Sequence, residues 1–188
     1  MSSPSMQLFT LPDMPLVKPG DDLATLITDG LSRAGEKLQD GDILVLAQKI
    51  VSKAANRIVD LRDVMPTAEA EALAVEVDKD PRQVQLILDE SVDVVGKRPG
   101  VLIVAHRIGI VMANAGIDAS NVEQDDGTEH VLLLPEDPDA DSRALRQTML
   151  ERHGVEISVI INDSVGRAWR QGTMGLAIGS AGLPALWD

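Results

Sequence analysis

Apolar residues recur at helical spacing along several parts of the chain. Between residues 21 and 37, Leu23, Ile27 and Leu31 fall on one face, and Asp21 or Asp22 precedes them as an N-terminal cap. A similar pattern at residues 67–77 begins with Thr67 as a cap, and another at residues 81–90 begins with Pro81, which suits a first helical turn. Helices are therefore expected at residues 21–37, 67–77, 81–90 and 143–152.

Short apolar runs lie between these helical patterns. The run ILVLA at residues 43–47 and the run ISVII at residues 157–161 have the length and composition of buried strands. Two further runs flank the polar pair His106 and Arg107, as the arms of a β-hairpin do. Strands are therefore expected at residues 43–47, 101–105, 109–113, 132–134 and 157–161.

The order of these elements indicates an α+β protein. Helices and strands do not alternate strictly, and the hairpin favours mixed or antiparallel sheets with flanking helices. Residues 135–141, PEDPDAD, have the composition of a loop and are the best candidate for a boundary between two lobes. We therefore expect a main lobe over residues 1–134 and a second lobe over residues 135–188.

Charge and composition restrict the partners. The chain has 30 acidic and 17 basic residues among 188, and its net charge of −13 repels nucleic acids and anionic membranes. With one Phe, two Trp and no Tyr it lacks the aromatic side chains on which bases stack. The absence of cysteine excludes disulfides and thiol nucleophiles. We expect a cytoplasmic protein without nucleic-acid or membrane partners.

Three polar clusters each follow an apolar run, where loops at strand ends commonly present functional groups. They are QKIVSK at residues 48–53, NAGIDASN at residues 114–121 and NDSVGRAWR at residues 162–170. Together they supply carboxylate, hydroxyl and amide oxygens as well as Lys and Arg cations. Magnesium or manganese bound together with a phosphate group requires these side-chain types.

Each of these residues also has an ordinary structural interpretation. An isolated Asp118 is typical of a turn or a cap, Lys53 of a surface charge, and Arg170 of a surface ion pair. The glycines of residues 172–182 match neither common phosphate-binding spacing, so close backbone packing is an equal alternative. Only the combination of the three clusters favours a functional site.

Four segments resemble, in the same order, the coenzyme F420-0:L-glutamate ligase family, the gamma-glutamyl ligases of deazaflavin coenzyme biosynthesis. They cover nearly the whole chain: MPLVKPGDDL, VLAQKIVSKA, RPGVLIVAHRIGIVMANAGIDASNVE and NDSVGRAWRQGTMGLAIGSAG. The resemblance implies a gamma-glutamyl ligase-like fold, a homodimer, and GTP-dependent addition of L-glutamate to F420-0, with further gamma-linked glutamates as an extension. An acyl phosphate is the implied intermediate, and GDP and phosphate are released.

The same resemblance implies roles for individual residues. Manganese or magnesium is implied, with potassium as a further candidate, and the implied metal ligands are Asp118, Asp163 and Ser164. The implied GTP-site residues are Met14, Pro15, Leu16, Val17, Gln48, Lys53 and Asn121. The implied catalytic residues are Lys53, Arg167 and Arg170.

Some features depart from the family pattern. Ala55 and Asn56 replace a frequent Glu-Gly pair, and members of the family typically continue for some tens of residues beyond the AIGSAG motif. The second lobe is therefore expected to be C-terminally incomplete relative to the family. Two alternatives stay open: a non-catalytic remnant or regulatory module that binds GTP and metal, and a related amide ligase with a different acceptor.

Overall fold

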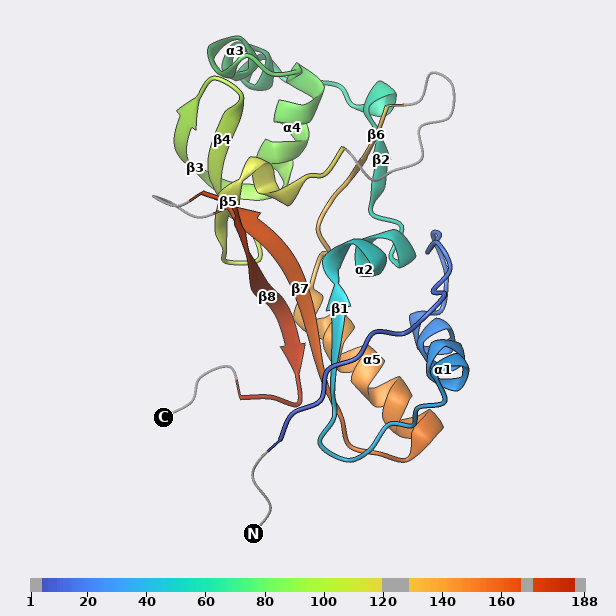
Figure 1. Ribbon diagram of the computed structural model, residues 1–188. Coiled ribbons are helices and arrows are strands. Elements are labelled where there is room, and N and C mark those ends of the chain that lie inside the picture. Colours follow the sequence, from blue (N-terminus) through green and yellow to red (C-terminus); the bar gives the residue numbers. More distant parts are fainter. Residues whose placement is uncertain (1–4, 120–128, 167–170, 185–188) are drawn as a thin grey trace.

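The computed structural model describes residues 5–119, 129–166 and 171–184 (Figure 1). It confirms the α+β class, because helices pack against three small sheets in the described part of the chain. Its helices are α1 Leu23–Ala34, α2 Gln48–Ala54, α3 Ala68–Val77, α4 Pro81–Asp89 and α5 Pro138–His153. Its strands are β1 Ile43–Ala47, β2 Ile58–Asp60, β3 Ser91–Arg98, β4 Val101–His106, β5 Val111–Ala113, β6 His130–Leu132, β7 Ser158–Gly166 and β8 Thr173–Ala181.

One sheet has the order β1-β7-β8, with β1 parallel and β8 antiparallel to the central β7. Helix α5 packs against β7 and β8, and α1 packs against α5 (Figure 1). The apolar core of this layer includes Ile27, Leu31, Leu46, Met149, Val159 and Ile161. Because β1 pairs with β7, the sheet crosses the boundary predicted at residue 134.

The first helix confirms its prediction and shows how its ends are fixed. The Asp22 carboxylate accepts hydrogen bonds from the backbone N–H groups of Ala24 and Thr25, and Gly35 ends the helix at a φ of 70°. Arg152, at the end of α5, donates to the Asp22 carboxylate at 2.6 Å. This hydrogen bond, together with those from Thr25, lowers the pKa of Asp22 to about 2, and it ties the two helices together.

Strand β1 confirms the predicted strand, but the prediction that it is buried is wrong. The side chains of Ile43 and Val45 are 52% and 55% exposed, whereas Leu46 is buried. An apolar run is also compatible with an edge strand whose second face has no covering element. Strand β1 lies at the edge of its sheet and pairs with β7 alone among the described strands.

A second layer holds β3, β4 and β5 with helices α3 and α4 (Figure 1). The predicted hairpin is confirmed, because β4 and β5 are antiparallel and joined through the turn after His106. Strand β3, which pairs with β4, was not expected. Its register shifts at Ser91/Asp93 and at Val94/Gly96 interrupt the simple alternation that a sequence pattern detects.

The predicted ends of some helices and strands are wrong for identifiable reasons. The Pro- and Asp-rich segment predicted as a loop contains the start of α5, where Asp137 caps the helix and Pro138 is its first residue. Proline and acidic residues suit a helix start as well as a loop, because the first turn needs no N–H from proline and favours negative charge. Strand β6 ends at Leu132, two residues before the predicted end.

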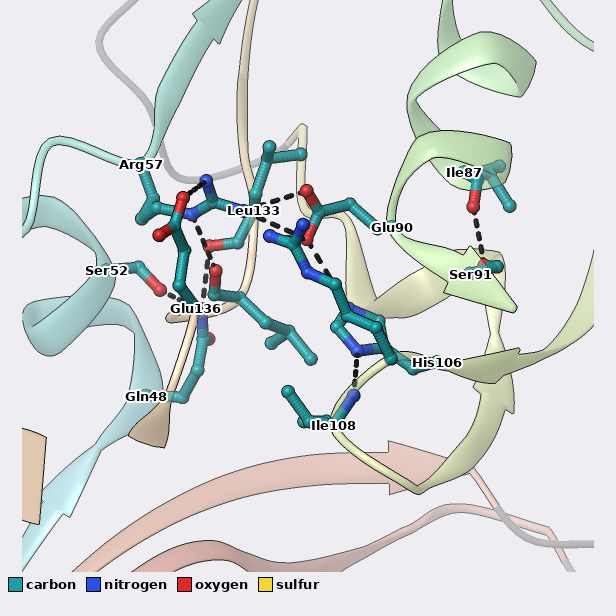
Figure 2. Close-up of polar contacts among 12 residues, drawn as sticks. Gln48, Ser52, Arg57, Ile87, Glu90, Ser91, His106, Ile108, Leu133 and Glu136 are labelled. Atoms are coloured by element: carbon teal, nitrogen blue, oxygen red, sulfur yellow. Dashed lines mark hydrogen bonds and ion pairs between the residues drawn. The ribbon is translucent and has the colours of Figure 1, made fainter. Parts of the chain in front are cut away.

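A buried ionic network joins the two layers (Figure 2). Arg57, between α2 and β2, donates to both carboxylate oxygens of Glu90 at 2.9 Å and to the Leu134 carbonyl at 2.9 Å. Arg107 contacts the same Glu90 carboxylate at 2.9 Å, and Glu136 pairs with Arg57. The Glu90 side chain is 6% exposed and pairs with both arginines, so replacing Glu90 would remove from the largely buried Arg57 the carboxylate to which it donates two hydrogen bonds. The network fixes the β4–β5 turn relative to α2.

His106 lies within this network and is held in its neutral form. The Ile108 backbone N–H donates to His106 Nδ1 at 3.1 Å, which leaves the ring proton on Nε2, 3.6 Å from a Glu90 oxygen (Figure 2). Burial, together with the nearby Arg107 and Arg57 charges, lowers the pKa of His106 from 6.5 to about 4.

The neutral His106 gives a testable pH dependence of stability. Between pH 6.5 and pH 4 the unfolded chain binds a proton at this ring and the folded chain does not, so stability falls as the pH falls. From pH 7 to pH 5 the wild type should lose about 2 kcal/mol more than His106→Asn, measured by urea unfolding. Asparagine keeps an acceptor for Ile108 without titrating. Parallel pH profiles for the two proteins would contradict this assignment.

Candidate active site

A cavity of about 400 Å³ lies where the three polar clusters meet, and its volume is within the range of small-molecule sites. The ends of β1, β5 and β7 and the start of α2 surround it. Its lining consists of Ala47, Gln48, Lys49, Met112, Ala113, Gly116, Ile117, Asp118, Asn162, Asp163, Ser164, Val165 and Gly166. Four residues to which the resemblance assigned roles are therefore brought together: Gln48, Asp118, Asp163 and Ser164.

The parallel pairing of β1 and β7 explains why the first and third clusters meet. Ala47, the last residue of β1, is paired with Asn162 of β7, and the carboxyl ends of parallel strands meet at the same edge of a sheet. Residues 48 and 49 therefore lie beside residues 162–164. Strand β5 also contacts β7, which brings the second cluster to the same edge.

The first cluster is a helix and not the predicted loop. Helix α2 begins directly after β1, without a side-chain cap on the Ala47 residue that precedes it. The Gln48 amide is buried and donates to the Ser52 hydroxyl at 2.7 Å and to the Leu133 carbonyl at 3.5 Å (Figure 2). Gln48 therefore fixes the start of α2 against the segment after β6, in addition to lining the cavity.

The second cluster forms a tight left-handed turn. Asn114, Ala115 and Gly116 have φ angles of 50°, 52° and 66°, although only glycine adopts this region without cost. The Asn114 side chain accepts a hydrogen bond from the Leu102 backbone N–H at 3.0 Å, which fixes the turn to β4. Asn114 is therefore structural. The turn delivers Asp118 to the cavity.

Asp118 is held in place through its backbone. Its N–H donates to the Leu132 carbonyl at 3.0 Å, and its carbonyl accepts from the Leu132 N–H at 2.8 Å. Its side chain, 19% exposed, forms an ion pair with Lys49 in which Nζ and Oδ2 are 2.5 Å apart. Asp118 therefore presents a carboxylate whose charge is balanced, at least in part, by a lysine of α2.

The third cluster continues the β7 strand beyond the predicted end at residue 161. Asp163 and Ser164 lie within β7, and the Ser164 backbone N–H donates to the Asp163 carboxylate at 2.7 Å. On the neighbouring β8, a Cβ at Gly175 would lie 3.1 Å from the Asn162 amide oxygen, so glycine leaves room for that side chain. Of the two alternatives for the glycines of residues 172–182, close packing explains Gly175, which lies in strand β8.

Other residues implied by the resemblance lie elsewhere. Lys53, in the last turn of α2, is absent from the described lining of the cavity. The lysine of α2 that lines the cavity is Lys49. Residues 14–17 also lie outside the described lining. Met14 contacts α1, because its sulfur accepts a hydrogen bond from Arg33 at 3.7 Å. Three implied residues fall outside the described parts of the chain: Asn121, Arg167 and Arg170.

Lys49 was one of the cations that the first polar cluster supplied, but the resemblance implied a role for Lys53 and none for Lys49. The position of Lys49 immediately after a predicted strand was a signal that could have identified it. Which lysine of residues 48–53 reaches the cavity depends on their conformation, because a loop and a helix point successive side chains in different directions.

The donor chemistry of the cavity fits a divalent cation held together with a phosphate-containing ligand. Asp118, Asp163 and Ser164 supply hard oxygen donors, which Mg²⁺ and Mn²⁺ prefer. No group of three or more His, Asp or Glu side chains within the described residues could enclose a metal ion. Mg²⁺ is usually bound by one or two carboxylates together with substrate phosphates, so two carboxylates are sufficient for this type of site.

A second cavity, of about 240 Å³, lies beside the start of α1 and is a poorer candidate. Asp21, Asp22 and Asp141 line it, and its described lining contains no Lys or Arg. Burial and the neighbouring Asp137 and Glu136 raise the pKa of Asp141. A pocket of this charge disfavours anionic ligands such as nucleotides.

Comparison with known families finds one family whose model covers almost the whole chain. The model of the family described as F420-0:Gamma-glutamyl ligase matches residues 13–188. The chain belongs to the F420-0:gamma-glutamyl ligase family. This match confirms the family that the sequence motifs indicated. The matched range includes every residue of the cavity lining.

Members of this family from three archaea show how far the similarity extends. The chain is 44% identical to the coenzyme F420:L-glutamate ligase of Methanothermobacter thermautotrophicus over 183 residues. The matched segment covers 97% of this chain and 71% of the relative. It is 40% identical over 185 residues to the enzyme of that name in Methanopyrus kandleri, covering 98% and 70%. It is 42% identical over 189 residues to the enzyme of that name in Haloarcula marismortui, and the match covers 97% of this chain and 70% of the relative.

None of the helices in the described part of the chain combines the length and the apolar character needed to cross a bilayer.

Proposed function

We propose that this chain is a GTP-dependent ligase that joins L-glutamate to the F420-0 precursor through an amide bond. The observation that carries the proposal is the meeting of Lys49, Asp118, Asp163 and Ser164 around one cavity in a member of the F420-0:gamma-glutamyl ligase family. The names of the archaeal relatives support the substrate pair of coenzyme F420 and glutamate. Dependence on GTP and on a divalent metal is the part of the proposal that goes beyond those names.

The proposed reaction has two steps. A carboxylate oxygen of F420-0 attacks the γ-phosphorus of GTP and forms a new P–O bond. The bond between the γ-phosphorus and the β–γ bridging oxygen breaks, and GDP departs with that oxygen. The glutamate amine then attacks the carbonyl carbon of this acyl phosphate, forming the amide, losing a proton and releasing phosphate. Both steps move phosphate charge, which favourably placed cations stabilise.

The residues of the cavity have distinct proposed tasks. Asp118, Asp163 and Ser164 would hold a divalent cation by their oxygens, and a bound cation would neutralise phosphate charge and orient the transferred group. Lys49 adds a positive charge at the same edge. The left-handed turn and the Leu132 hydrogen bonds hold Asp118 in position, so little reorganisation is needed on binding.

The proposal is tested by incubating the purified protein with F420-0, L-glutamate, GTP and Mn²⁺. Mass spectrometry should show a product one glutamyl residue heavier, formed together with an equal amount of GDP. Omitting the metal or replacing GTP by ATP should reduce product formation strongly. Equal rates with ATP, or without any divalent metal, would contradict the proposed cosubstrate or metal.

The same assay separates the alternatives. Calorimetric binding of GTP and metal without product would favour a non-catalytic module. Product formation with another carboxylic acid, but not with F420-0, would favour a ligase with a different acceptor. The homodimer implied by the family resemblance and the roles of Lys53, Arg167 and Arg170 stay predictions. So do the GTP contacts of residues 14–17, Gln48 and Asn121.

A further inference from the structure

The Lys49 ammonium group contacts a carboxylate that the proposed metal site would use. Lys49 Nζ lies 2.5 Å from Asp118 Oδ2, and both residues line the cavity. We infer that Lys49 is an exchangeable counter-ion of this site, which neutralises Asp118 in the free protein and is displaced when a divalent cation binds. This inference rests on the proposed function and adds a role that the family resemblance did not supply.

The energetics favour exchange over a permanent pair. The Lys49 side chain is 42% exposed, and a partly exposed ion pair of this kind is weak because water screens it. A divalent cation carries twice the charge of an ammonium group and interacts correspondingly more strongly with the same carboxylate. Displacement therefore costs little, and the long flexible lysine side chain allows Nζ to move.

The backbones of Asp118 and Lys49 are both held in place by hydrogen bonds. The Asp118 backbone is fixed by its two hydrogen bonds to Leu132, so its carboxylate stays in place when Nζ leaves. The Lys49 backbone is fixed within α2. Rotation of the Lys49 side chain would therefore withdraw Nζ from the Asp118 carboxylate while both backbones stay in place.

Exchange would also reverse the sign of the charge in the cavity. In the described lining, one lysine faces two carboxylates, Asp118 and Asp163, so the lining carries net negative charge. When a divalent cation enters and Lys49 remains nearby, the lining becomes net positive. Because the whole chain carries a net charge of −13, this local reversal is needed before a polyphosphate is attracted. The cation should therefore promote nucleotide binding, and Lys49 should set how readily the cation enters.

The test compares Mn²⁺ binding to the wild type and to Lys49→Met, measured by calorimetry without nucleotide. Removing the internal competitor should tighten Mn²⁺ binding by about twofold to fivefold, the range expected for losing a partly exposed ion pair. With Mn²⁺ at saturation, the same variant should bind GTP more weakly, because the cavity has lost a positive charge. A merely structural role for Lys49 would not shift the two affinities in opposite directions.

Lys97→Met is a matched control. The Lys97 side chain is about as exposed as that of Lys49 and forms an ion pair with Glu76 at 2.7 Å, outside the cavity lining. Its loss changes the net charge by the same amount. This variant should bind Mn²⁺ as the wild type does. In an Asp118→Asn background, Lys49→Met should no longer tighten Mn²⁺ binding, because the carboxylate for which the two cations compete is gone.

The possible results separate the inference from the proposed function. Unchanged or weaker Mn²⁺ binding by Lys49→Met, with intact binding by the wild type, would overturn the counter-ion role alone. Absence of Mn²⁺ binding by every variant, with or without GTP, would overturn the counter-ion role and the proposed metal site together. Tighter Mn²⁺ binding by Lys49→Met without any ligation of F420-0 would support the counter-ion role and count against the proposed reaction.

Discussion

Replacing Asp163 by asparagine should lower the rate of glutamate ligation by about a thousandfold, equivalent to about 4 kcal/mol of transition-state stabilisation. Asparagine has nearly the same shape and keeps an oxygen that accepts the Ser164 N–H bond, so the end of β7 should stay folded. What it removes is the negative charge that would hold a divalent cation at the edge of the cavity. The rate is measured as GDP and glutamylated product formed with F420-0, L-glutamate and Mn²⁺.

Two controls make this result specific to the site. Asp93→Asn changes the same charge on the exposed surface of β3, away from the cavity, and should leave the rate unchanged. Urea unfolding of Asp163→Asn should match that of the wild type. A stable Asp163→Asn protein with nearly wild-type activity would remove Asp163 from the proposed metal site.

Replacing Gly179 by alanine should destabilise the fold by about 4 kcal/mol, which makes it the largest expected effect of a substitution on stability. A Cβ at this position would lie 2.4 Å from the Pro138 carbonyl oxygen and 2.5 Å from its carbon. Real side chains do not approach backbone so closely, and either β8 or the start of α5 must shift. The free energy of unfolding is measured in urea, and near-ultraviolet circular dichroism reports the loss of packing.

The start of α5 cannot move easily to relieve this contact. The buried Ser142 hydroxyl donates to the Pro138 carbonyl at 2.8 Å, and Asp137 caps the first turn. The Ser180 N–H on β8 donates to Asp139 at 2.8 Å, which holds the two elements together at this point. Because β8 pairs with β7, the strand that carries Asp163, a shift here should also disturb the cavity.

Gly96→Ala is the matched control for Gly179→Ala. Gly96 also lies within a strand, but its added Cβ would have Ile103 Cβ at 3.9 Å as its nearest neighbour. This substitution should be neutral or stabilise by about 0.5 kcal/mol, because alanine loses less backbone entropy on folding. Equal stability of Gly179→Ala and Gly96→Ala would show that α5 and β8 are less tightly packed than the structure indicates.

Local sequence determined the elements whose ends have a chemical marker. Asp22 and Gly35 fix the ends of α1, and the polar pair His106 and Arg107 marks the β4–β5 turn, so these elements were predicted correctly. The order of the motifs also determined the family, because side chains of fixed type at fixed spacing need no folded structure to be identified.

Only the tertiary structure decided which polar residues meet. Lys49 and Lys53 both belong to the first cluster, but the cavity includes Lys49 because β1 pairs with β7 and α2 starts at that edge. Asn114 and Asp118 are neighbours in one motif, but one fixes a turn while the other faces the cavity. Local propensities fix short-range conformation, whereas convergence depends on strand pairing between residues more than a hundred positions apart, which no short window of sequence specifies.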